Sequence, residues 1–150
     1  MEREAGFLEA IEKFPGITVT VKNKHAGATM GEAKTVALQL SDELKQADGV
    51  FCPNESSTFG MLLALKQLGL AGKVKFVGFD ASPDLIKGLQ AGEINALVAQ
   101  NPTRMGYEAV KTLATHLRGQ TVEQRIDSGC RLVTEPSLTD PDMRKFLGLD

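Results

Sequence analysis

The alternation of amphipathic helix patterns with short apolar runs constrains the fold of this chain more than any other feature of its sequence. Apolar residues at helical spacing predict helices at 2–14, 30–47, 59–68, 83–92, 103–118 and 141–147. Apolar or alternating runs predict strands at 17–22, 50–52, 73–79, 94–99 and 130–133. Because strands that alternate with helices usually pair in parallel, the pattern predicts an α/β fold with a mostly parallel sheet.

Two stretches in the first thirty-odd residues carry clear local signals. Ile17, Val19 and Val21 alternate with polar residues, which is typical of a half-buried strand. Thr29 and Glu32 have the spacing of a capping box, in which each side chain bonds to the backbone of the other. The sequence therefore predicts that a helix begins at residue 30.

The composition is that of a folded domain and excludes several classes of function. The chain has 150 residues, of which 42% are hydrophobic and 24% charged, which suits one folded domain rather than a disordered chain. A net charge of -2 and an aromatic content of 5% argue against a surface that binds nucleic acid. No apolar run approaches the roughly 18–20 residues that cross a bilayer.

The cysteines and histidines give no basis for a disulfide framework or a metal site. Cys52 and Cys130 both lie in apolar stretches, where a buried free thiol is the expected state. His25 and His116 have no partner at metal-ligand spacing, so we expect ordinary surface or helix-face residues. The sequence predicts no metal and no cofactor.

Polar side chains follow three of the predicted strands at the point where each strand ends. Asn54 and Glu55 follow the second predicted strand, Asp80 follows the third and Gln100 follows the fourth. The carboxyl ends of parallel strands meet at one edge of a sheet, where open α/β sheets bind their ligands. Amide and carboxylate groups suit a ligand rich in hydroxyls, because each hydroxyl both donates and accepts, whereas Asp80 would repel a phosphate.

Each of these residues also has a plainer structural interpretation. Asn54 could act only as the cap of the helix that follows it, and Asp80 could close an Asx turn. Gln100 could belong to the turn that comes after it. Asp84 is best explained as an acid in the first turn of a helix, where the helix dipole favours it. The functional signal is the shared edge rather than any single residue.

Motifs for common enzymatic chemistry are absent from the sequence. It has no G-x-G-x-x-G after a strand, no G-x-x-x-x-G-K-[ST] phosphate loop and no G-x-S-x-G elbow. Ser56, Ser57 and Thr58 have no evident His and Asp partners for a hydrolytic triad. Nothing in the sequence supplies a general base near neutral pH with a stated reason for a shifted pKa.

Four stretches of the sequence form a set whose order and spacing are specific. They are Arg3-Glu4-Ala5-Gly6-Phe7 with Ala10-Ile11, Phe51-Cys52-Pro53-Asn54-Glu55 with Gly60-Met61-Leu62-Leu63-Ala64-Leu65, Val77-Gly78-Phe79-Asp80, and Val98-Ala99-Gln100-Asn101-Pro102. Together they resemble the type I periplasmic sugar-binding proteins, most of all the ribose-binding class that serves bacterial ABC transporters. The resemblance implies a three-layer α/β sandwich with a mostly parallel sheet, which is one lobe of such a protein.

The resemblance also implies a ligand site. Arg3, Asn54, Asp80 and Gln100 match positions whose side chains hydrogen-bond the hydroxyls of a monosaccharide. Arg3 would donate, Asp80 would accept from two hydroxyls, and the two amides would do both. Without the resemblance, Arg3 would be taken for a solvated residue of a first helical turn. Ala28 stands about where ribose binders often carry an aromatic contact, which is a departure from that class.

Compared with the family pattern, the chain corresponds to only a part. Residues 1–101 resemble an incomplete C-terminal sugar-binding lobe, 102–128 a crossover helix that normally packs on the N-terminal lobe, and 129–150 the returning strand and last helix. We expect the N-terminal lobe and the first, central strand of the C-terminal lobe to be missing. Unpaired backbone groups and an uncovered apolar face on the helix at 103–118 would then favour self-association.

By resemblance, the function is that of the solute-binding component of a bacterial ABC sugar importer, which binds a monosaccharide between two lobes and docks on a membrane permease from the periplasm. No signal peptide opens the chain. As a truncated C-terminal part, we expect it to bind sugar weakly or not at all. Two alternatives stay open: the effector-binding core of a LacI-type repressor, and a receiver-like signalling domain with Asp80 as phosphate acceptor.

Overall fold

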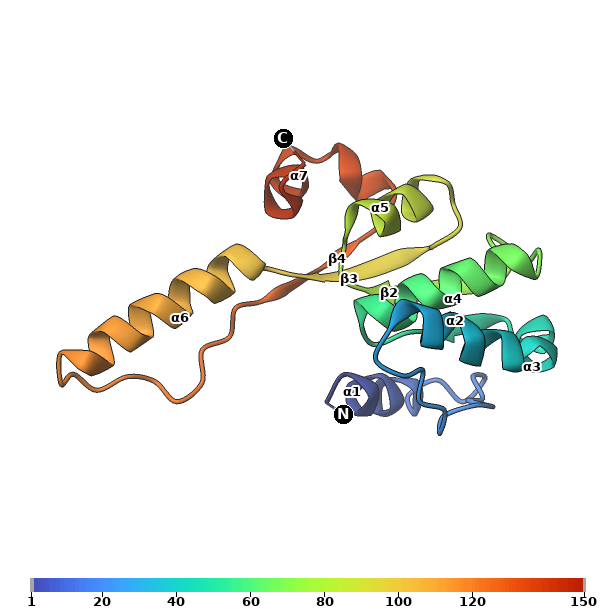
Figure 1. Ribbon diagram of the computed structural model, residues 1–150, viewed down its shortest axis with the longest axis horizontal. Coiled ribbons are helices and arrows are strands. Elements are labelled where there is room, and N and C mark those ends of the chain that lie inside the picture. Colours follow the sequence, from blue (N-terminus) through green and yellow to red (C-terminus); the bar gives the residue numbers. More distant parts are fainter. Residues whose placement is uncertain (1, 150) are drawn as a thin grey trace.

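Helices and strands alternate through most of the structure, a computed structural model that describes residues 2–149 (Figure 1). In chain order the elements are α1 (Glu2–Ile11), α2 (Met30–Gln39), α3 (Ser41–Gln46), β1 (Gly49–Phe51), α4 (Glu55–Gln67), β2 (Lys75–Phe79), α5 (Pro83–Gln90), β3 (Ala96–Gln100), α6 (Pro102–Leu117), β4 (Cys130–Val133), the 3₁₀ helix η1 (Pro136–Thr139) and α7 (Pro141–Leu147). The elements predicted from residue 49 onward are all present, with ends shifted by a few residues.

The strands form one open sheet in the order β1-β2-β3-β4. β1, β2 and β3 are parallel, and β4 pairs antiparallel with β3 so that Gln100 lies opposite Cys130. The carboxyl ends of the three parallel strands therefore meet at one edge, as the sequence pattern predicts. This confirms an α/β fold with a mostly parallel sheet.

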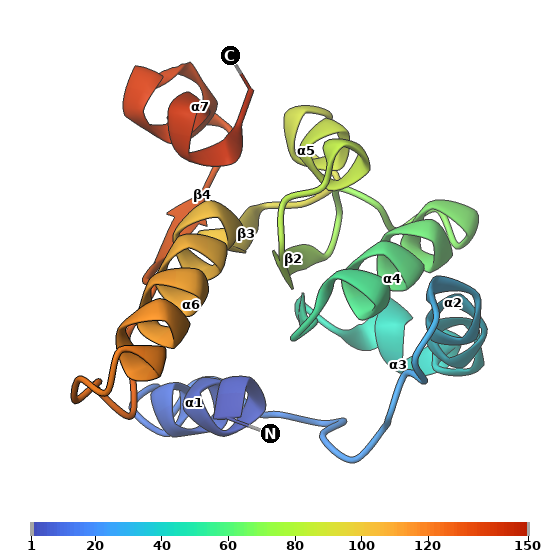
Figure 2. The same ribbon diagram turned by 60° about the vertical axis from the view of Figure 1, so that its left-hand side comes forward.

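The hydrophobic core lies on one face of this sheet. Phe76, Leu97 and Val133 point into it and are almost fully buried beneath α4, α5 and the C-terminal helices. α2 packs on the outer side of α4, which Figure 2 shows from a second direction. On the opposite face α1 lies against β1, where the rings of Phe7 and Phe51 stack with their centroids 4.5 Å apart.

The strand predicted at 17–22 is wrong, because these residues are irregular and Ile17 is 52% exposed. Within residues 2–149, β1 is an edge strand that pairs with β2 alone, and no strand lies between β1 and this segment for the segment to pair with. A strand without a partner would hold its backbone groups in an extended line with nothing to bond. Alternating apolar residues are therefore not enough to form a strand here.

The single helix predicted at 30–47 is also wrong, since it breaks at Leu40 into α2 and α3. Leu40 has φ -96° and ψ 23°, and its N–H bonds back to Ala37 at 3.1 Å rather than one residue further. The capping box at the start of α2 is present, with Thr29 and Glu32 each bonding to the other's backbone. The apolar periodicity does not mark this break.

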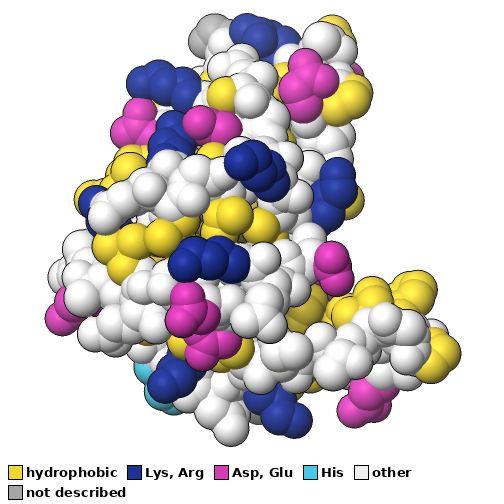
Figure 3. Space-filling view, turned by 90° about the vertical axis from the view of Figure 1, so that its right-hand side faces the viewer, with side chains coloured by type: hydrophobic (Ala, Val, Ile, Leu, Met, Phe, Trp, Pro, Cys, Tyr) yellow, Lys and Arg dark blue, Asp and Glu magenta, His cyan; other side chains and the backbone are white. Residues whose placement is uncertain are grey.

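Charged side chains of both signs are mixed on one face of the molecule. On the face seen in Figure 3, Lys and Arg side chains are interspersed with Asp and Glu. Among residues 2–149 the structure has no helix that is long and apolar enough to cross a membrane. The same residues contain no cluster of side chains suited to holding a metal ion.

The two cysteines differ in their environment. Cys52 is buried at the end of β1, and burial raises the pKa of its thiol to about 12. Cys130 is exposed, so the expectation of a buried thiol is wrong there. The reason is topological: Cys130 begins the edge strand β4, where a side chain can point to solvent although its neighbours are apolar.

Candidate functional site

Asp80 lies directly after β2 and joins two neighbouring elements at the carboxyl edge of the sheet. Its φ of 67° is in the left-handed region, which turns the side chain toward β3 and the start of α4. The Gln100 side chain donates from Nε2 to Asp80 Oδ1 at 2.7 Å, and the Glu55 N–H donates to Oδ2 at 3.1 Å. Asp80 thus accepts from both neighbours rather than closing a turn of its own.

Asn54 begins α4 at the same edge. Its Oδ1 accepts from the Ser57 N–H at 2.9 Å and from the Ser56 hydroxyl at 3.1 Å, so the cap interpretation is correct for this oxygen. The apolar pattern alone predicts that this helix begins at Phe59. The Asn54 cap explains why α4 instead begins at Glu55. This leaves the amide NH₂ of Asn54 as the donor that the cap does not use.

Arg3 reaches this edge from α1, although it is far from Asn54 and Asp80 in sequence. Its Nη1 donates to the Pro53 carbonyl at 2.8 Å, and its guanidinium lies 4.3 Å from the centre of the Phe79 ring. The Phe51 ring meets the Phe79 ring edge-on, with the two ring centroids 6.3 Å apart. The Phe7–Phe51 stack holds α1 against the same strands. A cation over an aromatic face is favourable and fixes the plane of the guanidinium.

Thr58 is a residue of this site that the sequence reasoning missed. It is fully buried, and its hydroxyl donates to the Asn54 carbonyl at 2.7 Å while accepting from the Phe79 N–H at 2.9 Å. It therefore ties the start of α4 to the end of β2, the two segments that carry Asn54 and Asp80. A threonine four residues after a helix cap gives no sequence signal of a bond to a strand 21 residues away.

The four residues of the predicted site thus lie along one edge, but they are not equally connected. Asp80 and Gln100 are in direct contact, and Asp80 reaches the segment of Asn54 through the backbone of Glu55. Arg3 contacts the strand ends through Pro53 and Phe79 rather than through the other three residues. All four are partly exposed, so their remaining polar groups can face a ligand.

A hollow of about 340 Å³ lies beside this edge rather than on it. Its walls include Glu55, Ser56 and Phe59 from the start of α4, together with Ser82 and Asp84 from the start of α5. None of the four predicted residues lines it. Asp84 pairs with Lys87 at 2.9 Å in the first turn of α5, as expected of a helix-start acid. The candidate site is an open rim rather than an enclosed pocket.

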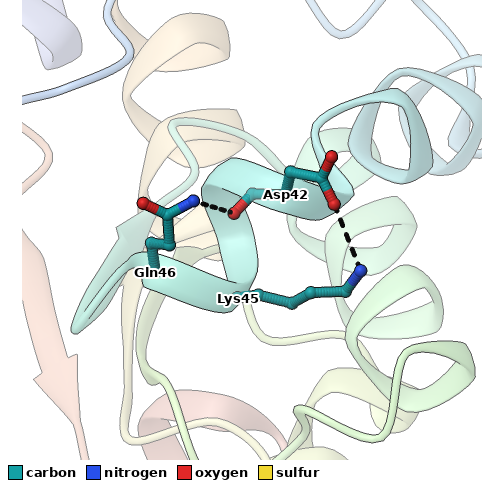
Figure 4. Close-up of polar contacts among 3 residues, drawn as sticks. All are labelled: Asp42, Lys45 and Gln46. Atoms are coloured by element: carbon teal, nitrogen blue, oxygen red, sulfur yellow. Dashed lines mark hydrogen bonds and ion pairs between the residues drawn. The ribbon is translucent and has the colours of Figure 1, made fainter.

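Side chains of the same kinds on the short helix α3 make only local contacts. On α3, Asp42 pairs with Lys45 at 3.2 Å, and the Gln46 amide donates to the Asp42 carbonyl at 3.3 Å (Figure 4). All three residues lie within one turn of one helix. The bond between Asp80 and Gln100 instead joins the ends of two strands, so the rim is a built arrangement and the α3 contacts are ordinary surface chemistry.

Comparison with known proteins decides the family. A family model described as a periplasmic binding protein domain matches residues 1–121. The chain belongs to the periplasmic binding protein family. A ribose import binding protein of Salmonella typhimurium is 34% identical over 138 residues, covering 88% of this chain and 44% of that protein. A D-allose-binding periplasmic protein of Escherichia coli is 31% identical over 111 residues, covering 74% of this chain and 35% of that protein.

Solved structures show the same fold for members of this family. A carbohydrate transporter solute-binding protein from Agrobacterium radiobacter, in complex with D-arabinose, superposes with a TM-score of 0.87 at 32% identity and covers 95% of this chain. An ABC transporter solute-binding protein from Agrobacterium vitis, bound to α-D-tagatopyranose, gives a TM-score of 0.87 at 29% identity over 95% of this chain. This chain covers 48% of each of those two structures, so it spans about half the length of the relatives it matches.

Proposed function

We propose that this chain contributes one side of the monosaccharide site in the solute-binding component of a bacterial ABC sugar importer. The observation that supports this most is the rim at the carboxyl ends of β1, β2 and β3. There a carboxylate, two amides and a guanidinium are brought to one edge from four separate segments, and Asp80 and Gln100 are already bonded to each other. The curated relatives are named for the binding or import of ribose and allose.

In this proposal each side chain has a distinct role toward a sugar. Asp80 accepts from two adjacent hydroxyls, while Gln100 is held by Asp80 Oδ1 and presents its carbonyl oxygen as an acceptor. Asn54 uses Oδ1 to cap α4 and donates from its free NH₂. Arg3 donates from the guanidinium nitrogens that do not bond to Pro53. No bond in the sugar is made or broken, so the protein is not an enzyme.

The biological setting follows from the same proposal. The protein acts in the periplasm, and it delivers its sugar to a membrane permease. Ligand would favour a closed form in which both sides of the site contact the sugar, by an amount set by its differential affinity for that form. Because the chain spans about half the length of its relatives, we expect the rim alone to bind a monosaccharide weakly.

The test is a titration that detects weak binding at named groups. The ¹⁵N-labelled chain is titrated with D-ribose, D-allose and D-arabinose to high millimolar concentration, and its backbone and side-chain amide signals are followed by NMR. We expect saturable shifts at the side-chain amides of Asn54 and Gln100 and at the Glu55 N–H. Asp80→Asn should weaken binding at least about ten-fold, because a hydrogen bond to a charged group is lost.

The control is Asp42→Asn on α3, which removes the same charge from a residue with only local contacts (Figure 4). It should leave the sugar-dependent shifts unchanged. The proposal is contradicted if no sugar shifts these amides at high concentration, or if the shifts persist in Asp80→Asn. Tight binding by this chain alone would contradict the expectation of a half site.

A further inference from the structure

Asp80 has a backbone conformation that its surroundings must maintain. With a φ of 67°, it is the one non-glycine residue among residues 2–149 whose φ is positive. Such a conformation is unfavourable for a residue with a Cβ and persists where neighbouring contacts fix the backbone. The Asp80 N–H donates to the Val98 carbonyl at 3.0 Å, and the preceding Phe79 N–H donates to the Thr58 hydroxyl at 2.9 Å. Thr58 therefore anchors the backbone directly before Asp80.

The Thr58 side chain lies directly against the β2 backbone at Gly78. Thr58 is fully buried there. A Cβ at Gly78 would overlap Thr58 Cγ2 and would lie 2.9 Å from Thr58 Oγ1. A larger residue at position 78 would therefore push the Thr58 hydroxyl away from the Phe79 N–H. Glycine at position 78 makes room for the threonine, so the contact is specific to this pair of residues.

Two hydrogen-bonded links join the start of α4 to the end of β2. In the first, the Glu55 N–H donates to Asp80 Oδ2 at 3.1 Å. In the second, the Thr58 hydroxyl donates to the Asn54 carbonyl at 2.7 Å while it accepts from the Phe79 N–H. Asn54 and Glu55 are adjacent, as are Phe79 and Asp80, so the two links close a ring. The separation between the Asn54 amide and the Asp80 carboxylate therefore depends on both links.

We infer that Thr58 is a positioning residue that determines which arrangement of sugar hydroxyls the rim accepts. This rests on the proposed function, in which the Asn54 amide donates to the sugar and the Asp80 carboxylate accepts from it. Two hydrogen-bonding groups held at a fixed separation favour the sugar whose hydroxyls match them, because a mismatched sugar leaves a polar group unpaired. Thr58 is fully buried and acts through the backbones of Asn54 and Phe79 rather than by touching the sugar.

The test compares two sugars that differ in the direction of one hydroxyl. D-ribose and D-arabinose are epimers at C2, and NMR titration of the ¹⁵N-labelled full chain gives a dissociation constant for each. We expect the original chain to favour one of them. Thr58→Val should weaken binding of the favoured sugar about three- to ten-fold, which corresponds to about one neutral hydrogen bond, and should bring the ratio of the two constants closer to one. Thr58→Ser keeps the hydroxyl and should retain the original ratio.

The ratio separates positioning from stability. If Thr58→Val only unfolded part of the population, both dissociation constants would rise by the same factor and their ratio would not change. Leu89→Ala is the control, because Leu89 is fully buried in the last turn of α5, at the end of that helix farther from Asp80. This variant should lose stability and keep the original ratio. A change of ratio in Leu89→Ala as large as that in Thr58→Val overturns the inference.

Failure of this inference can be told apart from failure of the proposed function. An unchanged ratio in Thr58→Val overturns the inference and leaves the proposed function standing, as does an original chain that binds both sugars equally well. If the original chain binds neither sugar, the proposed function fails and the selectivity with it. The sugar-free spectrum then still reports on positioning, because the Glu55 N–H and the Gln100 side-chain amide both bond to Asp80. Their signals should move in Thr58→Val and not in Thr58→Ser, and signals that stay in place in Thr58→Val overturn the positioning role as well.

Discussion

Helices α4 and α6 are capped in the same way at their starts, but one is buried and the other is exposed. Each follows the carboxyl end of a strand, and each is capped by an asparagine whose Oδ1 accepts from a backbone N–H three residues on at 2.9 Å. α4 then buries six of its 13 residues between the sheet and α2. α6 has 16 residues and buries none of them.

The difference shows what a helical pattern does and does not determine. Helical spacing identifies which side chains share a face, and it does so for α6 at least as clearly as for α4. α4 has apolar or small residues on two sides, because it is packed on two sides. Whether a face is covered depends on which other segments are present, and residues far away in sequence decide that. Four pairs of substitutions test this contrast, beginning with the largest effect.

Leu65→Ala in α4 and Leu113→Ala in α6 make the same change in the two environments. Leu65 is fully buried in the core, so we expect a loss of about 2–5 kcal/mol in the free energy of unfolding. Leu113 is 57% exposed, and its change should stay within about 0.5 kcal/mol when the chain is dilute and monomeric. Denaturant unfolding followed by circular dichroism measures both. Similar losses in the two variants would mean that α6 is packed on the core.

Gly60→Ala and Gly106→Ala compare a helical glycine in each element. A Cβ at Gly60 would lie 2.5 Å from the Ala33 Cβ and 2.7 Å from the Lys34 nitrogen, so α2 would have to move away from α4. We expect a loss of about 1–3 kcal/mol. A Cβ at Gly106 meets nothing within 4 Å, so alanine should stabilise α6 by about 0.5–1 kcal/mol.

The readout for the glycine pair is thermal unfolding together with the helical circular dichroism signal. Gly60→Ala should lower the midpoint, whereas Gly106→Ala should raise the helical signal without lowering the midpoint. A neutral Gly60→Ala would show that the contact between α2 and α4 is looser than the structure indicates.

The same contrast explains which parts of the fold the sequence could predict. The elements of the β1–β3 region are predicted correctly because their partners lie close along the chain and each local signal agrees with the packing. The strand expected at 17–22 is not formed because a strand needs a neighbour, and within residues 2–149 no strand lies beyond β1 on that side. The prediction of one continuous helix over 30–47 is wrong for a different reason, since nothing in the apolar pattern marks the break at Leu40.

The site divides along similar lines. Asn54, Asp80 and Gln100 could be placed on one edge because the rule for parallel strands fixes where strand ends meet. Arg3 could not, because its contacts with Pro53 and Phe79 depend on how α1 docks. Its candidacy came from the family resemblance alone. Thr58 could not be predicted because it acts through one hydroxyl, which bonds to the backbone at the start of α4 and to the backbone of β2.

Thr58→Val and Thr115→Val remove a threonine hydroxyl from α4 and from α6. Both hydroxyls donate to the carbonyl four residues earlier, at 2.7 Å for Thr58 and 2.9 Å for Thr115, but only Thr58 also accepts from a strand N–H. Thr58→Val leaves the partly buried Phe79 N–H without this partner, so we expect a loss of about 1–3 kcal/mol. Thr115→Val should change stability by less than about 0.5 kcal/mol.

Serine at position 58 separates the hydroxyl from the shape of the side chain. Thr58→Ser keeps both hydrogen bonds and removes a methyl group, so it should retain slow hydrogen exchange at the Phe79 N–H, which Thr58→Val loses. Exchange measured by NMR reports this bond directly. Fast exchange in Thr58→Ser, or slow exchange in Thr58→Val, would show that the hydroxyl does not tie α4 to β2.

The smallest effect is expected at the helix starts, where α2 has a titrating cap and α6 does not. Glu32 Oε2 accepts from the Ala28 and Thr29 N–H groups, both at 2.9 Å, and these backbone bonds lower the pKa of its carboxyl in the folded chain. Because the pKa of Glu32 is lower in the folded chain than in the unfolded chain, the ionised carboxyl stabilises the folded state at pH values above the unfolded pKa. This contribution is lost as the pH falls through the folded-state pKa.

Glu32→Gln should therefore be less stable than the original chain at neutral pH, and the gap should shrink as the solution is acidified below the carboxyl range. The cap of α6 uses the neutral amide of Asn101, and α6 buries none of its residues, so Asn101→Ala should leave the global stability unchanged at both pH values. Denaturant unfolding at neutral and acidic pH measures both. Because α2 is packed on α4, global unfolding reports the loss of its cap, whereas the cap of an unpacked α6 is lost without unfolding the core. We expect the cap of α2 to affect the stability of the core and the cap of α6 not to affect it. A stability difference for Glu32→Gln that does not change with pH, or a global destabilisation by Asn101→Ala, would contradict this.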